Sequence, residues 1–222
     1  MSDGGPGTRE RLLQAAREVV ATEGLEGLTL RAIARRAGVS HGAPLRHFPT
    51  LASLLSAVAA DGFRRLVARI DDDLARAEAV AAAEGGRLDP LARLAVAGRA
   101  YVRFALADPG VFAVTFRPER VDVTDPDYAT AGYASFQQLV DLVTDAQATG
   151  WMAGERPEDV AAVLWAHVHG IAELALHGGL PAVVGHDDTE RLIALSNLVT
   201  LGVETPPVPD RPTDRPPREE QR

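Results

Sequence analysis

Apolar side chains recur every three to four residues through most of this 222-residue chain, and this spacing constrains the fold more than any other feature. It is the spacing of one face of an α-helix, whereas a half-buried strand would alternate apolar and polar residues. Glycine or proline stands at the breaks, and β-branched residues seldom cluster. We therefore predict an all-α protein.

The breaks between periodic segments set the bounds of the predicted helices. In the first part of the chain we expect a helix that ends at Gly24, a second from Thr29 to Gly38, a third short one, and a long fourth helix that frays before Gly85-Gly86. Later helices are predicted from Asp89-Pro90 to about Ala107, from Pro126 to Gly150, from Pro157 to about His177 and from Thr189 to Gly202. We expect a break at Asp108-Pro109-Gly110, an aromatic turn from Phe112 to Phe116, and a loop from Arg117 to about Asp125.

The amino-acid composition excludes several classes of protein. The chain has no cysteine, so it can form neither a disulfide framework nor a thiolate metal site. We find no apolar run near the roughly 20 residues that a bilayer span needs, and the N-terminal residues lack the apolar core of a secretory signal. The expected location is the cytoplasm, with no membrane partner.

Charge is distributed unevenly along the chain. The net charge of −8 argues against nucleic acid as a partner, because DNA affinity is built from cations that displace condensed counterions. Residues 8–47, however, hold seven Arg against four Glu, while Phe48 to the C-terminus holds 16 Arg against 26 acidic residues. The cations are therefore in excess at one end only.

That cationic end contains a candidate helix-turn-helix. The segment Thr29–Phe48, TLRAIARRAGVSHGAPLRHF, places an apolar helix, a glycine-containing turn and a short second helix in the required order. Such a turn lets the start of the second helix enter the major groove of DNA. From the pattern alone, a structural helical hairpin remains the alternative to DNA binding.

The run GLTLRAIARRAGVSHGAPLRHFPTLASLL resembles the TetR/AcrR family of transcriptional regulators. The likeness covers about residues 8–62 and fixes more than a dozen positions. It implies an all-α fold, a two-fold dimer, an N-terminal DNA-binding domain and a divergent C-terminal domain that holds a small-molecule effector. We also predict that the symmetric dimer binds a pseudo-palindromic double-stranded operator, because an isolated helix from Pro157 to about His177 would expose apolar surface on two sides. The expected domains are a helix-turn-helix domain over 8–52, an effector-binding and dimerisation domain over 53–203, and a disordered Pro-rich tail over 204–222.

Candidate DNA-binding residues follow from this resemblance, position by position. Arg31 falls on a base-contacting position, whereas Thr29 and His47 fall on phosphate-contacting ones. The groove-facing start of the third helix and its flanks supply the remaining candidates: Ser40, His41, Gly42, Ala43 and Arg46. The alternatives are a solvated cation for Arg31 and a packing or capping role for His47.

Two positions depart from the family pattern. Leu45 stands where the family usually has Tyr, and Leu51 where it usually has Lys. Both family residues usually touch phosphate, so the departures predict fewer phosphate contacts. Arg35, Arg36 and Arg46 lie nearby and are candidates to compensate.

The motif Leu164–Gly170, LWAHVHG, resembles the C-terminal domain of a TetR subgroup with a Trp/His/Gly signature. The resemblance implies that the last two long helices form a four-helix dimer interface. We predict that the following residues take part in it: Val168, Ile171, Leu174, Leu195, Leu198 and Val199.

Aromatic and polar residues of the C-terminal part are candidates to contact the effector. The set comprises Tyr101, Phe104, Phe112, Phe116, Phe136, Trp165, His169 and Glu173. Packing in the core is the alternative role for the aromatic members. His169, Glu173 and His177 share one helical face, which is compatible with a metal, but we favour a polar group of a pocket or interface and expect no metal and no cofactor.

The sequence thus favours a DNA-binding repressor that a small-molecule effector releases from its operator. One alternative is a family member that has lost DNA binding and acts as a dimeric sensor or scaffold, motivated by Leu45 and Leu51. A second is a metal-dependent helical enzyme that uses the face of His169, Glu173 and His177. We expect no enzymatic activity.

Overall fold

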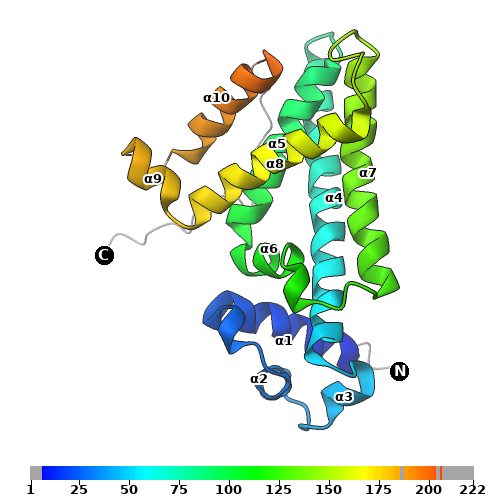
Figure 1. The fold of residues 1–222 in the computed structure, drawn as a ribbon, viewed down its shortest axis with the longest axis vertical. Coiled ribbons are helices and arrows are strands. Elements are labelled where there is room, and N and C mark those ends of the chain that lie inside the picture. The colour runs from blue at the N-terminus through cyan, green and yellow to red at the C-terminus, as the bar shows by residue number, and fades with distance from the viewer. Residues whose placement is uncertain (1–6, 186–187, 204–205, 207–222) are drawn as a thin grey trace. The chain divides into compact units, whose positions relative to one another are not determined.

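The computed structural model describes residues 7–185, 188–203 and 206 (Figure 1). Within them every regular element is helical and no strand occurs, which confirms the predicted fold class. The elements are α1 (Thr8–Glu23), η1 (Leu25–Gly27), α2 (Leu30–Arg36), α3 (Ala43–His47), α4 (Leu51–Ala83), α5 (Pro90–Ala107), α6 (Pro109–Thr115), η2 (Pro118–Arg120), α7 (Pro126–Gln147), α8 (Pro157–Leu176), α9 (Gly179–Val184) and α10 (Thr189–Leu201).

The chain divides into two compact units. Unit 1 comprises Met1–Val67 and Asp108–Gln138, and unit 2 comprises Ala68–Ala107 and Leu139–Arg222. Helices α4 and α7 each contribute to both units. The predicted domain boundaries remain predictions, and the predicted disordered tail lies outside the described residues apart from residue 206.

The core of unit 1 fixes the helix-turn-helix. Leu12 and Val19 of α1, Ile33 of α2 and Leu54 and Val58 of α4 are fully buried in one apolar cluster. These residues recur at helical spacing on each element, so each helix places one face in the core. Helices α1, α2 and α3 pack against one another around it (Figure 1).

The turn between α2 and α3 has the geometry that its sequence predicts. Thr29 caps α2 by accepting a hydrogen bond from the backbone N–H of Ala32 at 3.1 Å. At the other end Gly38 has φ +65°, and the N–H of Val39 donates to the carbonyl of Ala34 at 3.1 Å. This is a Schellman ending, for which glycine is the favoured residue.

Helix α6 corrects the prediction of a break followed by an aromatic turn. The Asp108 carboxylate accepts a hydrogen bond from the N–H of Val111 at 3.2 Å, and Pro109 occupies the first helical turn. Aspartate at the N-cap and proline at the first position start a helix as well as end one. The expected loop after α6 contains one further turn of helix, η2, and α9 lies where the sequence pattern predicts no helix.

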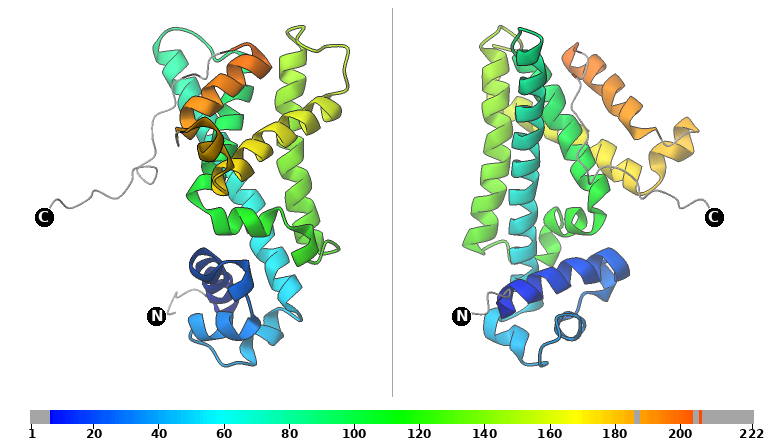
Figure 2. Two further views of the ribbon diagram at one scale, coloured as in Figure 1. Left: turned by 60° about the vertical axis from the view of Figure 1, so that its left-hand side comes forward. Right: turned by 180° about the vertical axis from the view of Figure 1, so that it is seen from behind.

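Helix α5 lies at the centre of unit 2, with α8 and α10 packed against it (Figures 1 and 2). Asn197 of α10 is buried and its side-chain amide donates to the carbonyl of Ala95 at 3.2 Å. Glu190, at the start of α10, pairs with Arg99 at 2.8 Å and with Arg103 at 2.5 Å. Polar contacts at two points therefore fix α10 along α5.

Helix α8 corrects the expectation that no apolar stretch nears the length of a bilayer span. By length and composition alone its 20 residues could cross a membrane, because few charged residues interrupt them. Most of the helix is not buried within the described chain, and among its residues only Val160, Ala161 and Ala172 are fully buried. Within the described chain, the helix therefore leaves most of its apolar surface uncovered.

The close approach of α6 to α1 supplies a stability test. A Cβ at Gly110 would lie 2.9 Å from Val20 Cγ1 and 3.1 Å from the Val20 backbone carbon. The backbone at Val20 cannot move aside without disturbing α1. We therefore expect Gly110→Ala to destabilise the protein by about 1–3 kcal/mol through overpacking. This outweighs the roughly 1 kcal/mol that alanine gains over glycine inside a helix.

The measurement is urea unfolding at equal protein concentration, with Gly154→Ala as control. A Cβ at Gly154 meets no atom within 4 Å, so this variant should remain within about 0.5 kcal/mol of the wild type. Equal stability of the Gly110→Ala and Gly154→Ala variants would contradict the close approach of α6 to α1.

Candidate nucleic-acid interface and ligand site

The predicted DNA-binding residues lie on α2, on α3 and on the turn that joins them. Thr29, at the N-cap of α2, is exposed, and so is Arg31 in its first turn. Ala43 is half-buried at the start of α3. The remaining candidates are all exposed, namely Ser40, His41, Gly42, Arg46 and His47. The candidates therefore lie on one connected segment of unit 1 and are accessible.

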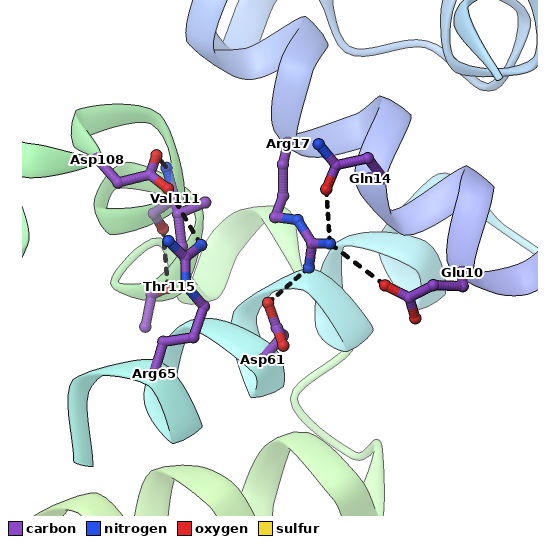
Figure 3. A network of polar contacts seen from close by, with 8 residues as sticks. All are labelled: Glu10, Gln14, Arg17, Asp61, Arg65, Asp108, Val111 and Thr115. Atoms are coloured by element: carbon purple, nitrogen blue, oxygen red, sulfur yellow. Dashed lines mark hydrogen bonds and ion pairs between the residues drawn. The ribbon is translucent and has the colours of Figure 1, made fainter. Parts of the chain in front are cut away.

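The arginines of the first three helices differ in their partners. Arg17 of α1 donates to Asp61 at 2.6 Å and lies 3.3 Å from Glu10 (Figure 3). Arg36 of α2 pairs with Glu18 at 3.0 Å. These two cations are neutralised within unit 1, which makes Arg36 a poor substitute for a lost phosphate contact.

Arg31, Arg35 and Arg46 form the contrasting set. All three are exposed, and none of their guanidinium groups forms an ion pair or hydrogen bond with a described residue. They lie on α2 and α3, the helices that carry the predicted interface. The unpaired positive charge of the helix-turn-helix is therefore concentrated where the sequence predicts contact with DNA, although the whole chain is acidic.

Helix α3 has one buried and one exposed side. Pro44 and Phe48, four residues apart, are buried, and the guanidinium of Arg9 lies 5.3 Å from the centre of the Phe48 ring. Leu45 points away from this buried side and is 57% exposed. The helix therefore presents an apolar side chain on the same accessible surface as Arg46.

The two departures from the family pattern have different environments. Leu51, at the start of α4, is half-buried and packs against the apolar core of unit 1. Its replacement by a cation would remove that packing contact. Leu45, by contrast, makes no contribution to that core. Of the two residues that depart from the family pattern, only Leu45 lies on the surface.

The predicted effector contacts are divided between the two units. Phe112, Phe116 and Phe136 belong to unit 1, and the other five belong to unit 2. In unit 1, Phe112 and Phe116 have ring centres 5.0 Å apart, and Phe116 meets Phe63 edge-on at 5.4 Å. The Phe63 ring also contacts Tyr128, which is not among the predicted effector contacts.

The five candidates of unit 2 are Tyr101, Phe104, Trp165, His169 and Glu173, and four of them form a polar chain. The indole N–H of Trp165 donates to the Tyr101 hydroxyl at 3.2 Å, and that hydroxyl lies 2.7 Å from His169 Nδ1. The opposite nitrogen of His169 lies 3.9 Å from the Glu173 carboxylate. The Tyr101 O–H can donate to Nδ1 if Nε2 carries the imidazole proton, which then lies on the side of the Glu173 carboxylate. Phe104 is buried on α5 one turn away from Tyr101.

Burial changes the acidity of two members of this chain. It raises the pKa of Tyr101 well above its ordinary value, and the Glu173 charge adds to this while the Trp165 hydrogen bond opposes it. Burial also lowers the pKa of His169, against the opposing charge of Glu173. Both shifts favour a neutral Tyr–His pair at neutral pH.

Glu173 lies between two histidines on α8. Its carboxylate is 3.2 Å from His177 Nδ1 and 3.9 Å from His169 Nε2. Among the described residues no group of three His, Cys, Asp or Glu side chains is arranged to hold a metal ion. The face that the sequence offered for a metal is thus occupied by carboxylate–imidazole contacts.

The predicted interface residues on α8 and α10 are mostly accessible. Val168 and Ile171 are half-buried, and Val168 Cγ1 lies 3.3 Å from the position of a Cβ at Gly98 of α5. On α10, Val199 is 85% exposed. The other exposed residues of the predicted interface are Leu174 on α8 and Leu195 and Leu198 on α10. Val163 of α8, which is not among the predicted residues, is 68% exposed.

Two family models match the chain. Residues 12–58 match the model of bacterial regulatory proteins of the tetR family, and residues 94–195 match the tetracyclin repressor-like C-terminal domain. The first match contains α2 and α3, and the second contains the Tyr101–Trp165–His169 contacts. No curated protein matched the sequence.

Several solved structures are similar over almost their whole length. A protein of unknown function from Rhodococcus sp. RHA1 is 32% identical, with 91% of this chain and 97% of that chain covered and a TM-score of 0.74. A transcriptional regulator from Rhodococcus sp. Rha1 is 25% identical, with 91% and 100% covered and a TM-score of 0.59.

A regulatory protein of the tetR family from Rhodococcus RHA1 is 20% identical, with 93% of this chain and 100% of that chain covered and a TM-score of 0.63. At this identity the likeness shows that the two chains share a fold. The match over residues 12–58 agrees with the helix-turn-helix of the structure, and the match over residues 94–195 agrees with its all-helical C-terminal part. The chain belongs to the TetR family of helix-turn-helix transcriptional regulators.

Proposed function

We propose that this regulator is a repressor that binds a pseudo-palindromic operator and is released by a small-molecule effector. The observation that carries the proposal is the set of exposed, unpaired cations Arg31, Arg35 and Arg46 on α2 and α3. Arg31 would contact a base edge, and Arg35 and Arg46 would contact phosphates or bases beside it. Thr29 and His47, both exposed, would add phosphate contacts.

The operator-binding form would be a homodimer. Helices α8 and α10 both expose apolar side chains, and His167 of α8 lies 2.5 Å from Ser196 of α10, so the two helices are joined. An apolar surface of this kind is typical of a site where another chain binds. A second copy of the same surface would complete a four-helix interface and present two recognition helices to DNA.

The effector would bind next to the polar chain of α5 and α8. Tyr101, Trp165, His169 and Glu173 combine aromatic surface with hydrogen-bonding groups, which is the usual character of a small-molecule site. Release requires that the effector bind more tightly to a form with misplaced recognition helices than to the operator-bound form.

Family membership places the chain among regulators and not among enzymes. The remaining alternative is a dimeric sensor that has lost DNA binding, and the unpaired cations on α2 and α3 favour the repressor over it. We further propose a cytoplasmic location with no membrane partner, because operators lie in the cytoplasm. We also propose that the chain belongs to the subgroup with a Trp/His/Gly signature, and the Leu164–Gly170 motif supports this assignment.

The first functional prediction compares two arginines of α2 that carry equal charge. If Arg31 contacts guanine through both terminal nitrogens, Arg31→Ala should lose about 1–3 kcal/mol of discrimination between operator and random DNA per half-site. The operator is first selected from random duplexes, and both affinities are then measured at one fixed salt concentration.

Arg36→Ala is the matched control, because it removes the same charge from a side chain that is already paired with Glu18. This variant should change the affinities for operator and random DNA by similar, small factors. If Arg31→Ala weakened both duplexes equally, Arg31 would contact phosphate and the proposed base contact would be wrong.

The second prediction concerns the dimer. Val199→Glu places a charge on the most exposed apolar side chain of α10 and should convert the protein from dimer to monomer at micromolar concentration. Operator affinity should fall with it, since the two half-site contacts are no longer linked. Sedimentation velocity gives the mass of each form.

Val123→Glu in unit 1 is the control, because Val123 is also exposed but lies outside the proposed interface. This variant should remain dimeric. A wild-type protein that sediments as a monomer at micromolar concentration would refute the dimer proposal.

A further inference from the structure

Leu45 is the largest apolar side chain that α3 exposes. It is 57% exposed, while the other large apolar residues of this segment, Pro44 and Phe48, are buried. His41, one helical turn before it, and Arg46, directly after it, are exposed polar residues. Leu45 therefore stands alone as an apolar group on a polar, accessible surface.

Burial explains why the side chain has this direction. Pro44 and Phe48 are four residues apart and define the side of α3 that packs on the core. Leu45 follows Pro44 by one residue, about 100° around the helix, and so points away from that core. Leu45 is not part of the apolar core of unit 1, so its replacement leaves that core intact.

The chemistry of the major groove limits what a leucine can contact there. An aliphatic side chain neither donates nor accepts a hydrogen bond, and it releases no counterion from phosphate. Among the base edges in the groove, the 5-methyl group of thymine is the apolar feature. A leucine placed over the other edges would remove water from polar atoms without replacing their hydrogen bonds.

We propose that Leu45 is a specificity-determining residue that selects thymine at one position of each half-site by contact with its 5-methyl group. The inference rests on the proposed operator binding through α3. Ala43 is half-buried and carries one carbon, and Gly42 carries none, so neither provides comparable apolar surface. The apolar residue at position 45 thus adds a base preference of its own and does not simply omit a phosphate contact.

The test removes the methyl group and nothing else. An operator is selected from random duplexes with the full chain, and thymine is then replaced by uracil at one position at a time within each half-site. At one position the wild type should bind about fourfold more weakly per half-site, and about fifteenfold when both half-sites are changed, as expected for losing one methyl-sized contact.

Variants assign that methyl contact to Leu45. Leu45→Ala should bind the thymine and uracil operators equally, whereas Leu45→Met, which keeps apolar reach, should still prefer thymine. Arg46→Ala is the control: it should bind both operators more weakly and retain the preference for thymine. Thermal unfolding of Leu45→Ala should match the wild type, because Leu45 is not part of the core.

The outcomes separate this inference from the proposed function. If the protein selects no sequence from random duplexes, operator binding itself is refuted, and the inference falls with it. If an operator is selected but uracil is tolerated everywhere, or Leu45→Ala keeps the thymine preference, operator binding stands and the role of Leu45 is overturned. A selected operator without thymine under α3 overturns it in the same way.

Discussion

The accessible surface of the helix-turn-helix depends on the burial of Pro44 and Phe48. Helix α3 has five residues, too few to be stable as an isolated helix, so its position depends on tertiary contacts. These two side chains, together with the packing of α1 and α2, hold it on the core of unit 1. The direction of every exposed residue on α3, including Leu45 and Arg46, follows from that attachment.

Charge pairing explains how an acidic protein can present a cationic surface. Arg17 and Arg36 are neutralised by carboxylates of their own unit, and so contribute to packing rather than to the external field. Arg31, Arg35 and Arg46 are left unpaired among the described residues, and they lie on two adjacent short helices. Local pairing therefore matters more for DNA binding than the net charge of −8.

The local features of this fold could be predicted from the sequence, because periodicity, caps and glycine turns act over a few residues. Thr29 and Gly38 bound α2 as their chemistry requires. Asp108-Pro109 has the same chemistry at the start of α6, but it also suits a helix end, so the helix was predicted as a break and a turn. Pairing between distant residues, such as Arg17 with Asp61 or Phe63 with Phe116, leaves no local signal.

The candidate effector residues show the same limit. They were grouped by residue type, yet the structure places Phe112 in one unit and Tyr101 in the other. Which aromatic side chains meet depends on helix packing, and residue type and local spacing do not reveal that packing. The Trp165–Tyr101–His169 chain likewise requires α5 and α8 to be adjacent, although their contacting residues are more than 60 positions apart.

Helix α8 carries candidate effector contacts on one face and candidate dimer contacts on another, so it could couple effector binding to dimer geometry. On one face, Trp165 donates a hydrogen bond to Tyr101 of α5 and Ala172 is buried, whereas Val163 and Leu174 are exposed on another face. A ligand that displaces Trp165 or His169 would shift the helix as a unit, because intrahelical hydrogen bonds make it rigid. Since Val163 and Leu174 belong to that same helix, the shift would change the surface that the proposed dimer uses. Under the proposed function, effector affinity and dimer geometry would be thermodynamically linked, and the effector would favour the dimer geometry that fits the operator less well.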